Sequence, residues 1–276
     1  MRSTLFVAVL LCGFARAEPL PDRELVSYID QRITSGEYVG MIVGYFDDSG
    51  SYTQSFGQIS NESEAAPDEH TIFEISSVSK TFAATLLADA VTRSAMSLDD
   101  PVNDYLEPKV RLASFRDRDI RLVDLAAHQS GLPNLPEAVN SGNELNPYAR
   151  FGEDALKSAI NTFQPDSTPG SGHLYSAFAY GVLALALSNK FDASFEELTE
   201  HSLTAPLGMH DTVATLQPEQ KARLAVGYTP EGAIAIPLDQ GALRAAGSMY
   251  STLADLMIWV RLHADKPDSS LGRAAR

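Results

Sequence analysis

The sequence predicts a mixed α/β fold in one domain-sized unit, and three patterns support this prediction. Residues 40–45 are apolar and β-branched, residues 47–50 form a turn signal, and residues 52–59 resume an extended pattern. Together they predict a β-hairpin. Apolar residues then recur at helical spacing after Ser77. Residues 224–237, interrupted by a Pro-Glu-Gly turn, predict a second and shorter hairpin.

The first long helix begins near Ser77, where Phe82, Leu86 and Ala90 share one face. Further helices are expected at residues 121–129, 153–163, 176–189, 195–205 and 252–264. The apolar stretch at residues 177–187 is too short to span a bilayer, so it predicts a buried helix and no membrane span. With 276 residues and 44% hydrophobic content, the chain can bury a sizeable core.

The amino terminus has the pattern of a secretory signal peptide. Arg2 gives a positive start, residues 5–14 are apolar, and Ala15-Arg16-Ala17 fits a cleavage site. The alternative, a membrane anchor, needs a longer apolar run. We expect residues 1–17 to be removed after Ala17 and the protein to be periplasmic or secreted. Because Cys12 is the one cysteine, the remaining chain would contain no disulfide.

Charge and residue spacing exclude several classes of partner and enzyme. The chain has 36 acidic and 21 basic residues, a net charge of −15, and no Lys/Arg cluster. It is therefore not expected to bind nucleic acid or anionic membranes. The six histidines form no His-x-His or His-x-x-x-His pair, so neither a metal nor another cofactor is expected. A Gly-x-Ser-x-Gly motif is absent, which argues against an α/β-hydrolase.

Ser77 and Lys80 are the strongest candidate catalytic pair. At the start of a helix, residues three apart lie on one face, so a hydroxyl and an amine can meet there. A lysine buried by the helix has a lowered pKa and can accept the serine proton. Ser79 points off this face, and Ser76 falls at the helix edge. The alternative is a helix-capping serine followed by a surface lysine.

Tyr175 is the third candidate. It follows the glycine-containing segment 170–173 and leads directly into the apolar helix. Close to an ammonium group, its phenol can act as a general base and then as a general acid. The alternative is a tyrosine on the rim of the fold with no chemical role. His128 is expected to make structural hydrogen bonds beside the turn at Gly131.

The segment Ser77-Val78-Ser79-Lys80-Thr81-Phe82 resembles the first motif of class C β-lactamases and of their relatives, the penicillin-binding DD-peptidases and family VIII carboxylesterases. The resemblance runs from about residue 22 to 270. It includes further matching segments at residues 97–102, 122–133, 206–209, 225–228 and 246–252.

The resemblance implies a β-lactamase/DD-peptidase-like fold, in which an α/β part with an antiparallel sheet flanked by helices lies beside a mainly helical part. Residues 18–75 and about 240–276 would form the α/β part, and about 76–239 the helical part. The site would lie in the groove between them. Ser77 would be the nucleophile, Lys80 its activating partner, and Tyr175 the tyrosine of a Tyr-x-Asn motif. The Ser77 backbone N–H would supply half of the oxyanion hole.

Two departures from the family pattern affect the functional prediction. Ala177 stands where Tyr-x-Asn has asparagine, which favours an ester or peptide substrate over a β-lactam. No Lys-Thr-Gly, Lys-Ser-Gly or His-x-Gly motif follows, so we expect a fragment that lacks the late strands of the sheet.

The sequence thus predicts a serine hydrolase that forms an acyl-enzyme with a β-lactam, an ester or a D-alanyl peptide, and that is monomeric when complete. Its substrate would be a small molecule or derived from peptidoglycan. The alternative is a non-catalytic penicillin- or peptidoglycan-binding protein.

Overall fold

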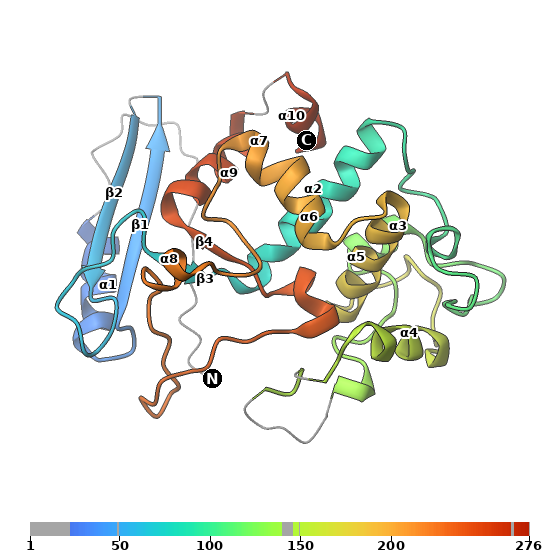
Figure 1. Ribbon diagram of the computed structural model, residues 1–276, viewed down its shortest axis with the longest axis horizontal. Helices are drawn as coiled ribbons and strands as arrows, with labels where there is room; N and C mark the ends of the chain where they lie inside the picture. Colours follow the sequence, from blue (N-terminus) through green and yellow to red (C-terminus); the bar gives the residue numbers. More distant parts are fainter. Residues whose placement is uncertain (1–22, 49, 140–145, 149, 266–267, 276) are drawn as a thin grey trace. The chain divides into compact units, whose positions relative to one another are not determined.

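The computed structural model describes residues 23–48, 50–139, 146–148, 150–265 and 268–275 (Figure 1). The expected signal peptide lies outside these residues. Contacts group the chain into two compact units, each of which is described by itself. Unit 1 contains the residues up to Ile75 together with His210–Pro237 and Tyr250–Val260, and unit 2 contains Ser76–Met209, Leu238–Met249 and Arg261–Arg276.

The chain enters unit 1 again at His210. Within unit 1, the Val213 and Tyr250 backbones exchange N–H and carbonyl groups at 3.0 and 2.8 Å. The division of the chain into an α/β part and a helical part with the bounds expected from the sequence stays a prediction.

Unit 1 contains the predicted hairpin. Strands β1 (Gly40–Asp47) and β2 (Gly50–Gly57) pair antiparallel, from Gly40 opposite Gly57 to Asp47 opposite Gly50 (Figure 1). Helix α1 (Arg23–Thr34) packs on β2. Gly44 leaves room for two side chains, because a Cβ there would come within 2.8 Å of a Leu253 methyl carbon and of the Met257 sulfur. The hairpin prediction is confirmed.

A second small sheet forms the centre of unit 1. Strand β3 (Ile72–Glu74) pairs antiparallel with β4 (Tyr250–Thr252). Phe73 packs in one apolar cluster with Ile42 of β1 and Leu253, the first residue of α9 (Leu253–Asp265). The short helix α8 (Pro218–Lys221) completes the unit.

The second predicted hairpin is not a pair of strands. The two predicted strands meet at one isolated bridge, Tyr228 to Ile234, around a turn in which Thr229 N–H donates to the Ala233 carbonyl at 2.7 Å. Leu224 instead bridges to Ile72 of β3. Ile234 and Ile236 are 62% and 60% exposed. Since neither apolar side chain is buried, the alternating pattern gains no packing energy that would extend the ladder.

Unit 2 is helical. Its α-helices are α2 (Ser79–Thr92), α3 (Leu122–Ala126), α4 (Glu153–Thr162), α5 (Ala177–Phe191), α6 (Phe195–Thr199), α7 (Ala205–Leu207) and α10 (Ser270–Ala274). Shorter 3-10 turns are η1 (Ser76–Val78), η2 (Val102–Tyr105), η3 (Glu137–Val139) and η5 (Gly241–Ala246), and η4 (Glu200–Thr204) is a π-helix. The predicted helices are thus confirmed, with the segment 195–205 divided by the π-helix.

Helix α5 is the centre of unit 2, as its apolar sequence predicted. Its residues from Ala177 to Leu187 are buried, and it packs against α2, α3 and η5. Gly181 allows the close approach of η5, because a Cβ there would lie 2.5 Å from a methyl carbon of Leu243. In the part of the chain that the structure describes, no helix has the length and apolar character needed to cross a membrane.

Helix α3 is shorter than the predicted span 121–129 because it ends in a Schellman motif. His128 has φ of +58°, in the left-handed region. Its N–H donates to the Leu125 carbonyl at 3.3 Å, and the N–H of Gln129 donates to Asp124 at 2.7 Å. This is the hydrogen-bond pattern that closes a helix C-terminus.

Candidate active site

Ser77 lies in the 3-10 turn η1, directly before helix α2. Its neighbour Ser76 has φ of +45°, an uncommon value for a residue with a Cβ. Ser77 itself is exposed, and the cap of α2 is Val78, which makes no side-chain cap bond. The alternative of a helix-capping serine is therefore wrong, and the Ser77 hydroxyl is accessible to a ligand.

Lys80 lies in the first turn of α2 and is 6% exposed. Its Nζ donates to the Ala246 carbonyl at 2.6 Å and to Ser77 Oγ at 3.4 Å. Burial lowers the pKa of Lys80, and the hydrogen bond and charge interaction with Tyr175 partly oppose this shift. The alternative of a surface lysine is therefore wrong. The environment instead favours an amine that can lose its proton.

Tyr175 reaches the same hydroxyl from the segment before α5. Its phenol O–H donates to Ser77 Oγ at 2.8 Å, and the Lys80 Nζ lies 4.7 Å from the centre of its ring. The structure therefore brings the three residues singled out in the sequence together at one oxygen atom. A serine hydroxyl between a phenol and a buried amine has the groups needed to release and recover its proton.

Hydrogen bonds distinguish Ser77 from the neighbouring serines Ser76 and Ser79. Ser79 is fully buried, and its hydroxyl donates to the Ser76 carbonyl at 2.6 Å and accepts from Met249 N–H at 3.2 Å. These bonds give Ser79 a structural role. Ser76 is exposed like Ser77, but the bonds from Lys80 and Tyr175 both go to Ser77.

The segment that carries Tyr175 runs along the segment that follows α3. Gly170 N–H donates to the Gln129 carbonyl at 2.8 Å, and the Ser176 hydroxyl donates to the Pro133 carbonyl at 2.7 Å. Ser176 also caps α5, since its hydroxyl accepts from Ala179 N–H at 2.8 Å. Tyr175 is therefore held by a well-bonded neighbour on its carboxyl side.

The structure places three further groups beside Ser77, Lys80 and Tyr175. The Tyr180 ring lies 5.6 Å from Lys80 Nζ, and the Ala246 carbonyl accepts from that amine. Burial, with a smaller effect from Tyr175, raises the pKa of Tyr180 to about 12. The sequence signal for Tyr180 was its place as the polar-headed residue of the otherwise apolar stretch 177–187.

His128 is the third added group. Its ring lies 4.5 Å from that of Tyr175, and its Nδ1 accepts from Ser176 N–H at 3.1 Å. Burial lowers the pKa of His128, and the positive charges of Lys80 and His173 lower it further.

Ala177 brings no side-chain hydrogen bond to the site. Its N–H instead donates to Asn134, to the backbone carbonyl at 3.0 Å and to the side-chain oxygen at 3.2 Å. The asparagine of a Tyr-x-Asn motif is therefore missing beside Lys80. The Lys80 amine instead donates to the Ala246 carbonyl.

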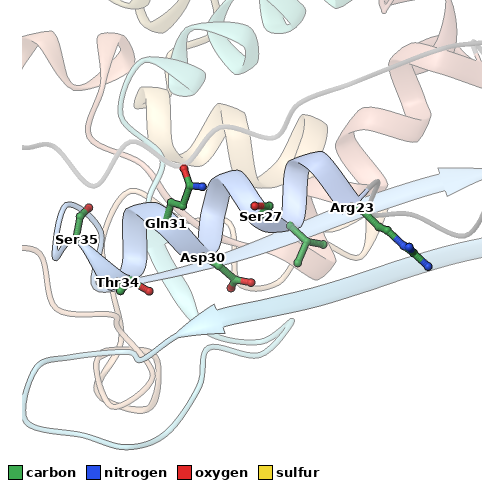
Figure 2. A pocket seen from close by; sticks show the side chains of 7 residues that line it. Arg23, Ser27, Asp30, Gln31, Thr34 and Ser35 are labelled. Atoms are coloured by element: carbon green, nitrogen blue, oxygen red, sulfur yellow. The ribbon is translucent and has the colours of Figure 1, made fainter.

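Two hollows of the surface do not contain these candidate residues. A depression of about 580 Å³ lies along α1, and Figure 2 shows its lining side chains, which come from that helix and the adjoining Ser35. A larger groove of about 1090 Å³ runs beside α4, α5 and α6 in unit 2, without any of the three candidate residues. Within the described residues, no group of three His, Cys, Asp or Glu side chains is arranged to bind a metal.

Comparison with known proteins agrees with the fold. The β-lactamase family model matches residues 25–276. The D-alanyl-D-alanine-carboxypeptidase/endopeptidase AmpH of Escherichia coli is 29% identical over 269 residues, which are 94% of this chain and 69% of AmpH.

Two solved structures have the same fold. A β-lactamase/D-alanine carboxypeptidase from Yersinia pestis has a TM-score of 0.77 and 25% identity, over 92% of this chain and 74% of that one. A class C β-lactamase has a TM-score of 0.79 and 24% identity, over 91% and 68%. The resemblance and the β-lactamase/DD-peptidase-like fold expected from the sequence are confirmed. The chain belongs to the β-lactamase family, a family of serine hydrolases.

Proposed function

We propose that this protein is a serine hydrolase that forms a covalent acyl-enzyme on Ser77. The observation that carries the proposal is the convergence of two proton-transfer groups on one accessible oxygen. The Tyr175 O–H donates to Ser77 Oγ at 2.8 Å, and the Lys80 Nζ lies 3.4 Å from the same atom.

Acylation begins with the neutral amine of Lys80, whose lowered pKa increases the fraction that has lost its proton. The amine accepts the Ser77 hydroxyl proton while Oγ attacks the acyl carbonyl, and a tetrahedral intermediate forms. The backbone N–H of Ser77 is one donor to its oxyanion. When the intermediate collapses, the bond to the leaving group breaks and Tyr175 gives its proton to that group.

The acyl-enzyme then contains a Lys80 ammonium beside a Tyr175 phenolate, and the short distance from the amine to the ring stabilises this pair. The phenolate takes a proton from water as the water oxygen attacks the acyl carbonyl. Lys80 returns a proton to Ser77 Oγ when the acyl group leaves. All three side chains are thereby restored to their starting protonation states.

We propose a D-alanyl peptide or an ester as the acyl donor ahead of a β-lactam. AmpH carries a carboxypeptidase name, and the Yersinia protein carries both a β-lactamase and a carboxypeptidase name. Ala177 points in the same direction, because its methyl group cannot hydrogen-bond the amide side chain of a β-lactam. The expected signal peptide would place the enzyme where peptidoglycan is found, and amino-terminal sequencing of exported protein should then begin at Glu18.

The test measures turnover of a chromogenic cephalosporin, a p-nitrophenyl ester and a D-alanyl-D-alanine peptide by the wild type and by Ser77→Ala. Steady product release that Ser77→Ala abolishes supports the hydrolase. Stoichiometric labelling of Ser77 by a fluorescent penicillin without turnover of any substrate supports the non-catalytic binding protein. Turnover that survives in Ser77→Ala contradicts the proposal.

A further inference from the structure

We propose that His128 is a positioning residue that holds Tyr175 against Ser77, by bonding the backbone on both sides of that tyrosine. This inference rests on the proposed function, because it assigns His128 a part in the proton transfers of the same site.

Two hydrogen bonds form the clamp. The backbone carbonyl of His128 accepts from Leu174 N–H at 2.8 Å, and its side-chain Nδ1 accepts from Ser176 N–H at 3.1 Å. The donors are the residues immediately before and after Tyr175. With both neighbours bonded to one residue, the Tyr175 backbone loses most of its freedom to move.

The imidazole also contacts the phenol ring directly. The two ring centres are 4.5 Å apart with an angle of 34° between the planes. This contact limits the rotation of the Tyr175 side chain, whose O–H must stay within hydrogen-bond reach of Ser77 Oγ.

The backbone conformation at the end of helix α3 does not require a histidine at position 128. His128 occupies the left-handed position of the Schellman motif, where glycine or asparagine is preferred. Histidine adopts this conformation more readily than most residues with a Cβ, but less readily than glycine. The imidazole therefore brings something that the helix end itself does not need.

The clamp requires a neutral imidazole. Because Nδ1 accepts a hydrogen bond, the proton of the neutral ring is on Nε2. An imidazolium would turn Nδ1 into a donor that faces the Ser176 N–H. Among the described residues, four side chains surround the ring. They are Lys80 of α2, His173 and Tyr175 of the segment before α5, and Tyr180 of α5. None of them carries a negative charge that would favour protonation while the tyrosines keep their protons.

Two substitutions separate the clamp from the helix end. His128→Gly keeps the left-handed backbone and removes the acceptor. His128→Asn keeps that backbone and places a side-chain oxygen where Nδ1 stands. The matched control is Asp192→Gly, which makes the same exchange at another left-handed residue, the C-terminal cap of α5.

The expected result is a loss of about 10- to 100-fold in kcat for ester hydrolysis in His128→Gly, with a nearly unchanged KM. Asp192→Gly should stay within about twofold of the wild type, and His128→Asn, which restores the acceptor but not the ring contact, should recover part of the loss. The melting temperature of His128→Gly should change little, because the freer left-handed backbone offsets the lost bond to Ser176 N–H. In the wild type, kcat should fall at low pH when the His128 imidazole is protonated. This fall should be absent in His128→Asn.

His128→Gly with unchanged kcat would overturn the proposal, as would equal losses in His128→Gly and His128→Asn. Amide hydrogen exchange gives a readout that does not need turnover. Ser176 should lose protection in His128→Gly and keep it in His128→Asn, and unchanged Ser176 protection in His128→Gly would also overturn the proposal. If the wild type hydrolyses nothing, the proposed function fails, while the exchange data still decide whether the clamp exists.

Discussion

Tyr175→Phe removes one oxygen atom from the site and leaves its surroundings in place. The lost O–H is the donor to Ser77 Oγ at 2.8 Å. The ring remains, and with it the contacts to the Lys80 amine at 4.7 Å and to the His128 ring at 4.5 Å. The substitution therefore tests the chemical role of the phenol with little change in packing.

The expected effects on rate and stability differ widely. A positioned general acid or base contributes about 10²- to 10⁴-fold to a rate, which corresponds to about 2.7–5.4 kcal/mol of the activation barrier. Tyr175 is 43% exposed, so water can replace its lost hydrogen bond. The free energy of unfolding should therefore change by less than about 1 kcal/mol.

Rapid-quench measurements with a D-alanyl-D-alanine peptide, whose amine leaving group needs the proton of Tyr175, give the acylation rate, and urea unfolding gives the stability. Tyr105→Phe is the matched control, because Tyr105 on η2 also donates its O–H to a side chain, that of Asp100. We expect this control to lose stability and to keep its rate. The reasoning is refuted if Tyr175→Phe acylates within about fivefold of the wild type, or if Tyr105→Phe slows acylation equally.

Three further predictions concern Lys80, Phe82 and Asp255. Lys80→Met should slow acylation of Ser77 by about 10³-fold. Stopped-flow pH profiles should also show a rise in the wild-type rate as pH increases through the lowered pKa of Lys80, and no such rise in Lys80→Met. Phe82→Ala should lower the free energy of unfolding by about 3–5 kcal/mol in urea titrations, because Phe82 is 0% exposed. Burial raises the pKa of Asp255, so its stabilising contribution is complete below the unfolded value of 3.8 and is lost as pH rises through the folded value. The difference in unfolding free energy between the wild type and Asp255→Asn should show that slope.

Local sequence patterns were sufficient for most of the fold. The turn signal between β1 and β2 and the apolar spacing of α2 and α5 are local properties, and the structure has these elements where they were predicted. The prediction of strands at residues 224–237 was wrong because alternation alone does not decide whether an apolar side chain is buried. The exposed Ile234 and Ile236 show that here it is not.

The active-site groups likewise fall into those that local sequence could pair and those that lie far apart in the sequence. Ser77 and Lys80 are three residues apart on one chain segment, so helix geometry was enough to pair them. Tyr175 lies 98 residues from Ser77, and only the resemblance to a family connected the two. The Ala246 carbonyl is 166 residues from Lys80, and a backbone acceptor leaves no trace in the identity of its residue.

The role of His128 was underestimated for a physical reason. The sequence placed it beside a turn, where a structural hydrogen bond was the natural expectation. Its bond to Ser176 does support the backbone. The contact with the Tyr175 ring, however, depends on the left-handed end of α3, which the sequence did not predict for a histidine.

The most direct test of the proposed mechanism is to locate the covalent adduct. The wild type is incubated with a penicillin or an activated ester, quenched in acid, and examined by intact mass and by fragmentation of its peptides. We predict one acyl group per chain, attached to Ser77, and none in Ser77→Ala. An adduct on Ser76 or Ser79, or no adduct on a folded wild type with any of these acyl donors, contradicts the mechanism.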